Sequence, residues 1–559
     1  MRLLTAEGVR EADRRAMENT EIPGILLMEN AGMRLTEAVL SLDPLPRKIL
    51  VLAGPGNNGG DGLVVTRHLQ KLGLQVEVCC TAPADKYRGD ALANLNILLH
   101  SGFSVRHIIE EGDLDYVRGR LARMEADDLV IDALLGTGTS RQVEGRIASL
   151  ISMINRARTR VMSVDIPSGI HADTGEVLGD AVRADWTVTF AFPKRGLMLF
   201  PGADYSGRVV VGEIYIPQEE APFEGVEVPE GRKVQELLPP RPRDSHKGTF
   251  GRALVVAGSP GMTGAAAMAG EAALRGGAGL VYLATAAGLR PVLESKLVEV
   301  ITLGLPEAYV ESHSHGGETG AETHNGNESS QEQGGVISAA GASLVLEWLQ
   351  ECRVLAVGPG MQPGEETYRL LERLLPASPV PVVLDAGALG ALSLDPELLR
   401  RAASEVVITP HPGEAASLTG MSVAEISQNR LQTARQMSQK WNVIVLLKGA
   451  PTVVAHPDGS AWVNPTGGPA LASAGTGDLL TGLITALVSQ GSGVTEAAVC
   501  GAFMHGLAGD LVPPEGRGVK AGDVLLNFPH AFNLVENSWW ETGLFGPFNR
   551  ELRPVVRQG

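Results

Sequence analysis

Gly475-Thr476-Gly477-Asp478, followed by the apolar run Leu479 to Ile484, is the stretch that decides the fold of the second half of this 559-residue chain. Its two glycines allow close backbone approach to a ligand, and the run after them is typical of a helix. The first free N–H groups of that helix and the positive end of its dipole favour a bound phosphate. A carboxylate would repel that phosphate, so we interpret Asp478 as a base aimed at a neighbouring substrate hydroxyl. The motif predicts phosphate-assisted chemistry on an alcohol.

Short β-rich runs alternate with helical patterns in both halves of the chain, which is the signature of parallel sheets covered by helices. The runs are 49–52, 76–78, 129–131, 161–164 and 187–190, then 254–256, 354–357, 382–384, 406–408 and 443–446. Two later runs, 452–455 and 461–463, flank Asp458-Gly459 and predict a hairpin. We therefore predict an α/β protein of two three-layer α/β/α domains, 1–217 and 244–559.

Three segments lack this alternation. Residues 218–243 are rich in Pro and Glu and are interpreted as a linker. Residues 311–335 are almost free of apolar side chains and are interpreted as a disordered surface insertion. The insertion holds His313, His315 and His324; a metal tract is conceivable, but the composition favours a solvated loop. The tail beyond Phe528, with Trp539-Trp540, carries no usable motif.

Composition narrows the class of protein. Apolar residues make up 44% and charged residues 20%, as in a folded soluble protein, and the net charge of -17 argues against nucleic-acid binding. The four cysteines (Cys79, Cys80, Cys352 and Cys500) show neither paired nor metal-site spacing, which favours a reducing compartment. The N-terminus turns polar too early for a signal peptide, and no apolar stretch is long enough to span a bilayer. We predict a cytoplasmic protein without a membrane partner, forming a homo-oligomer.

The first glycine loop, 54–62, allows two interpretations. Gly54, Gly56 and Gly59 satisfy G-x-G-x-x-G after a strand, and Glu77 lies about where a ribose-binding acid would stand, as in a hydride-transfer enzyme. However, Glu77 falls in the middle of a strand, and the turn is crowded by Asn57-Asn58 and Asp61. Such oxygen-bearing side chains suit a hydroxylated ligand or a hard cation.

Two further strand ends supply similar groups. Asp132 ends one strand before the glycine loop 136–138, and Asp165 ends another shortly before Ser168. Each acid alone could simply cap a helix or stiffen a turn. Because the carboxyl ends of parallel strands share one edge of a sheet, three such loops together favour a ligand site.

These loops, with 5–13 and 27–32, resemble the NAD(P)HX epimerase family, also called the YjeF N-terminal domain, over about 1–217. The resemblance implies a Rossmann-like domain that interconverts the R and S hydrates of NADH and NADPH, with Asp165 as the acid/base. It implies K⁺ ligands at Asn58, Asp132 and Ser168. It implies substrate contacts at Asn57, Asn58, Gly59, Gly60, Asp61, Gly136, Thr137, Gly138, Thr139, Ser140, Arg141, Gln142 and Asp165.

The second half places further polar or glycine-containing turns after its strands. They are 258–266, Gly358-Pro359-Gly360, Thr409-Pro410-His411-Pro412-Gly413-Glu414 and Lys448-Gly449-Ala450-Pro451-Thr452. A lone His is more often structural, but a His between two prolines at a strand end favours ligand contact. Lys448 supplies a point charge for phosphate. G-x-x-x-x-G-K-[ST] is absent, so the phosphate is expected at the 475–478 helix start.

This half resembles the ADP-dependent NAD(P)HX dehydratase family of the ribokinase-like superfamily, from about 244 to 527. The resemblance implies dehydration of the S hydrate with ADP, giving AMP and phosphate, with Asp478 catalytic and Mg²⁺ on the ADP phosphates. It implies hydrate contacts at Ala265, Gly360, His411, Pro412, Gly413, Glu414, Ala415, Ala416, Ser417 and Asp478. It implies ADP contacts at Lys448, Gly449, Ala450, Pro451, Thr452, Gly468, Pro469, Ala470, Leu471, Ala472, Ser473, Ala474, Gly475, Thr476 and Gly477.

Both halves thus point to one substrate pool, NADHX and NADPHX. The alternative enzyme is a sugar or vitamin kinase fused to a dinucleotide-binding domain. The alternative from another class makes the first half an interaction module, although intact Asn58, Asp132, Asp165 and Ser168 argue against a retired site.

Overall fold

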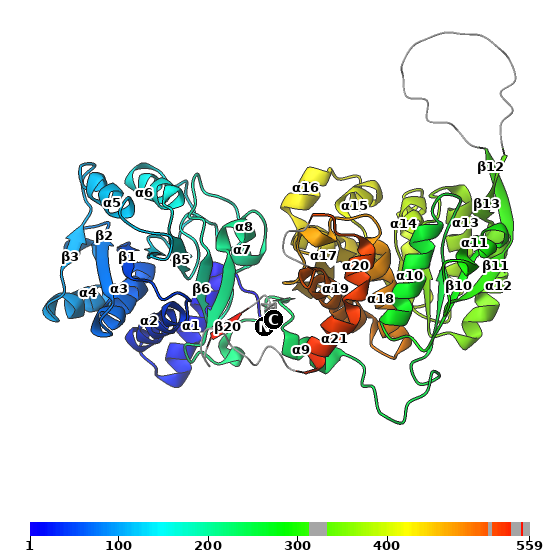
Figure 1. The fold of residues 1–559 in the computed structure, drawn as a ribbon, viewed down its shortest axis with the longest axis horizontal. Coiled ribbons are helices and arrows are strands. Elements are labelled where there is room, and N and C mark those ends of the chain that lie inside the picture. Colours follow the sequence, from blue (N-terminus) through cyan, green and yellow to red (C-terminus); the bar gives the residue numbers. More distant parts are fainter. Residues whose placement is uncertain (312–331, 513–516, 538–548, 552–559) are drawn as a thin grey trace, which may run out of the picture. The chain divides into compact units, whose positions relative to one another are not determined.

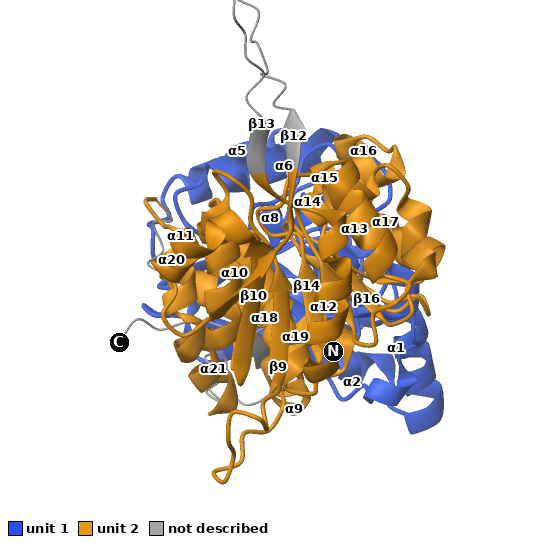
Figure 2. Ribbon diagram, turned by 90° about the vertical axis from the view of Figure 1, so that its right-hand side faces the viewer, with its two compact units in different colours: residues 1–230, 539–559 blue, residues 231–538 orange. Residues whose placement is uncertain are grey.

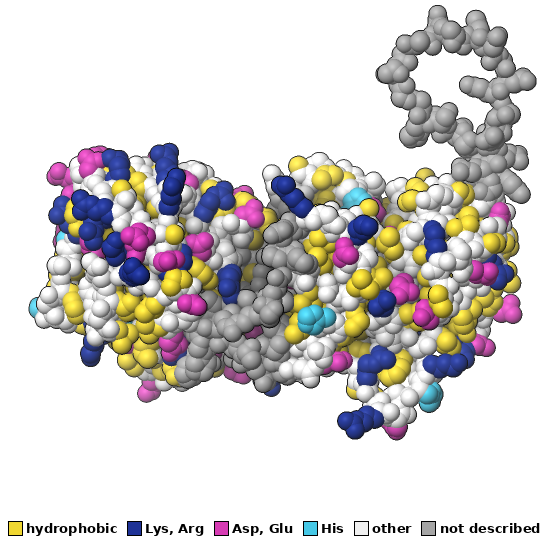
Figure 3. All heavy atoms as spheres, in the orientation of Figure 1, with side chains coloured by type: hydrophobic (Ala, Val, Ile, Leu, Met, Phe, Trp, Pro, Cys, Tyr) yellow, Lys and Arg dark blue, Asp and Glu magenta, His cyan; other side chains and the backbone are white. Residues whose placement is uncertain are grey.

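The computed structural model describes residues 1–311, 332–512, 517–537 and 549–551 (Figure 1). The chain divides into two compact units, which Figure 2 colours separately. The first comprises 1–230 with 539–559, and the second comprises 231–538. Acidic, basic and apolar side chains are interspersed on the face of each unit that Figure 3 shows. In the described ranges, no helix is both long and apolar enough to cross a membrane.

The first unit is built on one sheet whose described strands lie in the order β3-β2-β1-β4-β5-β6-β7-β20. All neighbours run parallel except β20, which is antiparallel to β7. The strand order reverses between β1 and β4, and in open sheets a reversal marks the ligand-binding crevice. The strands are β1 (Lys48–Ala53), β2 (Gln75–Cys80), β3 (Val105–His107), β4 (Leu129–Ala133), β5 (Arg160–Val164), β6 (Trp186–Phe190), β7 (Arg208–Gly212) and β20 (Asn549–Glu551).

Alternate residues of β1 enter two separate cores. Ile49 and Val51 pack with apolar side chains of α2, α3 and α4, whereas Leu50 and Leu52 pack with those of α5 and α6. Helices therefore cover both faces, as predicted for a three-layer α/β/α domain. The helices are α1 (Ala6–Thr20), α2 (Gly24–Leu40), α3 (Asn57–Lys71), α4 (Gly89–His100), α5 (Asp113–Leu121), α6 (Gly145–Arg156), α7 (Arg195–Met198) and α8 (Gly202–Ser206).

The second unit also has one large sheet, in the order β11-β10-β9-β14-β15-β16-β17-β18-β19. Its strands run parallel up to β17, and β18 and β19 add the predicted hairpin in antiparallel pairing. The order reverses between β9 and β14. The strands are β9 (Arg252–Val256), β10 (Leu280–Ala286), β11 (Ile301–Leu305), β14 (Val354–Val357), β15 (Val382–Leu384), β16 (Val406–Ile408), β17 (Ile444–Leu447), β18 (Val453–Ala455) and β19 (Ala461–Val463).

The helices of the second unit form two layers. Successive crossovers from β14 to β17 advance in one direction, so right-handed connections place α13 to α17 on one face; the return from β9 to β10 places α10 on the other. There α18 packs on α10 and on β9, β14 and β15. The helices are α9 (Gly231–Leu237), α10 (Thr263–Arg275), α11 (Arg290–Glu294), α12 (Ala342–Trp348), α13 (Glu365–Leu374), α14 (Gly387–Leu392), α15 (Pro412–Thr419), α16 (Val423–Gln428), α17 (Arg430–Trp441), α18 (Thr476–Ser489), α19 (Val494–Asp510), α20 (Ala521–Leu526) and α21 (Phe528–Glu536).

The segment 218–243, expected to be a linker, contains regular secondary structure. Residues up to 230 belong to the first unit, because β8 (Val226–Glu227) lies beside the N-terminal segment, and α9 starts the second unit at Gly231. The N–H of Leu3 donates to the Val226 carbonyl at 3.0 Å, and the N–H of Val228 donates to the Met1 carbonyl at 2.8 Å. Val226 and Val228 are both buried, and their alternation is the strand signal that a Pro- and Glu-rich composition conceals.

Two further boundaries differ from the predictions. The second domain does not run to 559, since β20 pairs with β7 of the first unit. The predicted insertion has ordered edges, because β12 (Glu307–Glu311) and β13 (Glu332–Ile337) pair in antiparallel fashion. The rest of the insertion, with His313, His315 and His324, lies outside the described residues, as do Trp539 and Trp540. The four cysteines are free and buried.

Candidate active sites

The glycine-rich start of α18 forms the expected anion site of the second unit. Gly475 precedes the helix at φ 94°, and a Cβ there would lie 2.5 Å from the Met268 sulfur. Among the described residues, the N–H groups of Gly477 and Asp478 have no acceptor. The Lys448 ammonium lies 3.4 Å from the position of a Cβ on Gly477. Free N–H groups and a cation therefore converge on one point, as a phosphate requires.

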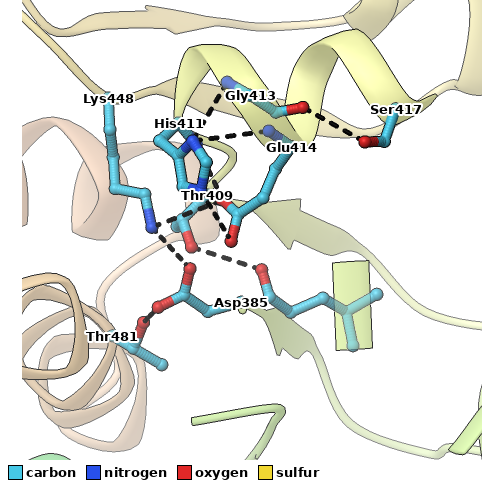
Figure 4. Close-up of polar contacts among 9 residues, drawn as sticks. Asp385, Thr409, His411, Gly413, Glu414, Ser417, Lys448 and Thr481 are labelled. Carbon is cyan, nitrogen blue, oxygen red and sulfur yellow. Dashed lines mark hydrogen bonds and ion pairs between the residues drawn. The ribbon is translucent and has the colours of Figure 1, made fainter. Parts of the chain in front are cut away.

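Lys448 is the centre of a buried charge cluster (Figure 4). Its Nζ donates to Asp385 Oδ1 at 2.7 Å and lies 3.8 Å from Glu414 Oε2. Thr481 of α18 donates its hydroxyl to Asp385 Oδ2 at 2.7 Å. Asp385 follows β15 directly and is 1% exposed, so it ties the lysine to the helix that carries Asp478.

The cluster determines the protonation of Asp478. Burial raises the pKa of the Asp478 carboxyl to about 7; Asp385 also raises it, Lys448 lowers it, and Glu414 raises it again. Burial by itself would lower the pKa of Lys448, but the Asp385 and Glu414 carboxylates outweigh this, so that pKa is raised. A carboxyl group that titrates near neutral pH is suited to acid–base catalysis.

His411 has a structural role in the protein without ligand. Its Nδ1 accepts hydrogen bonds from the N–H of Gly413 at 3.0 Å and of Glu414 at 3.4 Å. Glu414 Oε2 in turn accepts from the His411 N–H at 2.8 Å, which completes a capping box at the start of α15 (Figure 4). Cap and cluster are thus linked through Glu414, whose pKa is raised, chiefly by burial.

Two loops meet where the strand order of the second unit reverses. The N–H of Gly258 donates to the Pro359 carbonyl at 2.9 Å, and Ser259 donates its hydroxyl to the Gly360 carbonyl at 2.8 Å. Gly360 adopts φ 65°, and a Cβ on it would lie 2.5 Å from the Met262 carbonyl and 3.0 Å from Ala265. This position therefore requires glycine.

The loops expected to hold the nucleotide are fixed by hydrogen bonds with side chains within and outside them. Arg430, at the start of α17, donates to the Lys448 carbonyl at 2.8 Å. The N–H of Gly467 donates to Asp510 Oδ2 at 2.9 Å, and the Thr476 hydroxyl donates to the Leu471 carbonyl at 2.8 Å.

In the first unit, α3 begins inside the first glycine loop. Asn57 to Asp61 form its first turn, directly after Gly56. A Cβ on Gly59 would lie 1.8 Å from the Gly54 carbonyl, and one on Gly54 would lie 2.0 Å from the Leu134 carbonyl. The loops after β1 and β4 are therefore in backbone contact. Glu77 is bound instead by Tyr116 and by Arg120, at 2.5 Å, within the sheet, which argues against a ribose-binding role.

Asn58, Asp132 and Ser168 form one connected group of oxygen atoms. The Ser168 hydroxyl donates to Asp132 Oδ1 at 2.6 Å and accepts from the Leu135 N–H at 2.9 Å. Asn58 donates to the Leu135 carbonyl at 2.9 Å, and its buried Oδ1 has no partner among the described residues. An unpaired buried oxygen beside a carboxylate and a hydroxyl fits a hard cation such as K⁺. The exposed or half-buried loop 136–142 begins beside Asn58.

Asp165 follows β5 with φ 64°, a conformation that residues other than glycine rarely adopt. The fully buried Lys194 forms an ion pair with its Oδ1, and Thr189 donates to the same oxygen at 3.2 Å. Strained backbone of this kind concentrates at functional sites.

Comparison with known proteins gives a matching family model for each half of the chain. Residues 24–196 match the family model for the YjeF-related protein N-terminus, and residues 253–525 match that for NAD(P)H-hydrate dehydratase. The bifunctional NAD(P)H-hydrate repair enzyme Nnr of Moorella thermoacetica is 41% identical over 547 residues, covering 96% of this chain and 97% of the relative. That of Thermofilum pendens is 37% identical, covering 96% and 98%.

The chain belongs to the bifunctional NAD(P)H-hydrate repair enzyme family. The solved ADP/ATP-dependent NAD(P)H-hydrate dehydratase from Bacillus subtilis, co-crystallised with ATP/Mg²⁺, is similar to 56% of this chain and 100% of its own, at 29% identity and a TM-score of 0.45.

The predicted site residues of this repair-enzyme chain gather at the carboxyl edge of each sheet, and their binding roles stay predictions. Sequence reasoning missed Asp385 in the second unit. It also missed Lys194, Thr189 and Asp13 in the first. A signal existed for Asp385, because it is a polar residue directly after a buried strand.

Replacing Gly59 with alanine is expected to remove epimerase activity and destabilise the first unit by about 1–3 kcal/mol. The new Cβ would meet the Gly54 backbone, which cannot move without displacing the loops after β1 and β4. Gly119→Ala is the matched control: Gly119 lies in α5 with nothing near its Cβ position, so this change should stabilise by about 0.5–1 kcal/mol. The thermal unfolding temperatures and epimerisation rates of the two variants test this prediction. Equal stabilities and equal rates would contradict the steric argument.

Proposed function

We propose that this protein repairs hydrated nicotinamide cofactors: it epimerises R- and S-NAD(P)HX and dehydrates S-NAD(P)HX to NAD(P)H. The observation that carries the proposal is the sequence identity of 41% and 37% to two relatives named for this repair, each covering 96% of this chain. Spontaneous hydration gives both epimers. One chain with an epimerase and an S-specific dehydratase can therefore convert both epimers back to NAD(P)H.

In the second unit, ADP binds with its phosphates at the start of α18, against Lys448. Asp478 removes the proton of the C6 hydroxyl, and the oxygen takes the terminal phosphoryl group of ADP. The phosphate then leaves C6 with the C6–O electron pair, C5 gives up its added proton to water, the dihydronicotinamide double bond returns, and AMP is released. The N–H groups and Lys448 stabilise the charge on the transferring phosphoryl group.

Cations complete the proposal. Mg²⁺ bound with ADP would neutralise charge on the phosphates; within the described ranges, no cluster of three or more His, Cys, Asp or Glu suited to a metal ion exists. In the first unit, Asn58, Asp132 and Ser168 would hold K⁺, which would supply a positive charge for oxygen atoms of the hydrate. We further propose that the protein acts in the cytoplasm as a homo-oligomer and serves both NADHX and NADPHX.

A single assay tests the function. The mixed hydrates are supplied with ADP or with ATP, and the return of reduced-nicotinamide absorbance is followed together with free phosphate. Repair predicts stoichiometric NADH and phosphate. A fused small-alcohol kinase would instead accumulate a phosphorylated product without restoring NADH, and that result would overturn the proposal.

The dehydration rate should fall in acid with a midpoint near pH 7. Asp478 must be ionised to accept a proton, and burial raises its pKa to about 7, so kcat/KM should fall by about tenfold per pH unit below the midpoint and level off above it. Rates measured on the pure S hydrate between about pH 5 and 9 test this. A flat profile through neutrality would contradict the role of Asp478 as base.

A further inference from the structure

Four ionisable side chains lie near one another at the carboxyl edge of the first sheet, and the family resemblance assigns an acid–base role to only one of them, Asp165. Asp13 comes from α1, Asp61 from the first turn of α3, Asp165 from the turn after β5 and Lys194 from the residue before α7. Asp61 and Asp13 each interact electrostatically with Asp165 and with Lys194. Three carboxyl groups thus interact electrostatically with the single ammonium group of Lys194.

The Lys194 ammonium group forms an ion pair with Asp165. Lys194 is 1% exposed, and its Nζ contacts Asp165 Oδ1 and lies 2.9 Å from Thr189 Oγ1. Its backbone is held from both sides by Leu4, whose N–H donates to the Pro193 carbonyl and whose carbonyl accepts from the Arg195 N–H, each at 3.0 Å. This fixed ion pair therefore holds the Asp165 carboxyl group in one orientation.

The environment of Asp61 differs from that of Asp165. Asp61 is 9% exposed, and none of the described residues donates a hydrogen bond to its carboxyl group. Burial raises its pKa well above the usual range; the charges of Asp165 and Asp13 raise it and that of Lys194 lowers it. The pKa of Asp13 is raised less, to about 6, chiefly by burial. A buried carboxyl group kept neutral in this way can donate a proton.

We propose that Asp61 and Asp165 are the acid–base pair of the epimerisation, with Asp61 as the proton donor and Lys194 as the positioning residue that fixes the orientation of the Asp165 carboxyl group. This rests on the function proposed above. The strands before the two carboxyl groups, β1 and β5, lie on either side of β4, so the pair can address two atoms of one substrate.

The step balances without any co-reactant. Asp165 accepts the proton of the C6 hydroxyl, the C6 carbonyl forms, and the C6–N1 bond breaks with its electron pair passing to N1. N1 takes the proton of Asp61. After rotation about C5–C6, N1 attacks the other face of the carbonyl, its proton returns to Asp61, and the oxygen takes its proton back from Asp165. The product is the opposite epimer, and both carboxyl groups recover their starting states.

Asp61→Asn tests the donor. The amide has the shape of a neutral carboxyl group but supplies no acidic proton, so kcat for interconversion of the chromatographically separated R and S hydrates should fall about 100-fold with little change in KM. Dehydration of pure S hydrate by the same chain should be unchanged. Asp85→Asn, an exposed carboxylate in the same unit, is the matched control.

The outcomes separate two failures. If the unaltered protein does not interconvert the hydrates, the proposed function fails. If it does, and Asp61→Asn keeps kcat within threefold or loses only affinity, the function stands and the acid–base pair is overturned.

Lys194→Met tests the positioning residue. Without the ammonium, the Asp165 carboxyl group loses its ion pair and keeps the hydrogen bond from Thr189, so its orientation is no longer fixed. kcat for epimerisation should drop at least tenfold with little change in KM. A purely structural lysine would leave kcat of the folded variant within threefold, and that result would overturn its positioning role. Should this variant lose the fold of the first unit, Asp61→Asn alone decides.

Discussion

Asp478→Asn is expected to slow dehydration of the S hydrate by about 10²–10⁴-fold, because the amide keeps the side chain's shape but cannot accept the C6 hydroxyl proton. This equals about 3–5 kcal/mol of lost transition-state stabilisation. Nucleotide binding should persist or tighten, since Lys448 and the free N–H groups of α18 remain while a negative charge beside the phosphate is removed. Single-turnover rates and ADP affinity, measured separately, distinguish these effects.

Asp458→Asn is the matched control for this variant. Asp458 lies exposed in the β18–β19 turn, where asparagine is equally acceptable, so its replacement should leave dehydration unchanged. An Asp478→Asn protein that restored reduced cofactor at the original rate would contradict the mechanism proposed for the second unit.

The sheets could be predicted because their strands are continuous apolar runs ending in glycine or polar turns. β1, β14 and the β18–β19 hairpin lie where the sequence places them. β3 escaped prediction because Val105–His107 contains one apolar residue, and β20 because it pairs with a strand far away in sequence. The three-layer α/β/α architecture of both units could be predicted because strands and helices alternate along the chain.

Site residues that lie directly on motifs could be predicted, but their partners could not. Lys448 and Asp385 are 63 residues apart, and Lys194 and Asp165 are 29 apart, so no local pattern joins them. His411 is the opposite case, because its motif was recognised in the sequence but the contact that its ring makes was not predicted. Its position between two prolines suggested ligand contact, whereas its ring caps the helix that those prolines help to start.

Asp165→Asn is expected to convert complete repair into partial repair. Asparagine tolerates the left-handed backbone at φ 64° better than most residues, so the turn after β5 should keep its shape while losing the carboxylate. Epimerisation should fall by about 10²–10⁴-fold. Dehydration in the second unit should continue, so a mixed hydrate pool should yield NADH rapidly until the S epimer is exhausted and then almost stop.

The decisive measurement is the total amount of NADH formed when the reaction stops, because this amount does not depend on the dehydration rate. Adding a small amount of the Asp478→Asn protein, whose first unit is intact, should restart the reaction by supplying epimerase without dehydratase. If Asp165→Asn alone drives mixed hydrates to full recovery at the original rate, Asp165 is not the base. The buried Lys194 facing it would then belong to a structural ion pair, and another group of the first unit would have to be the base.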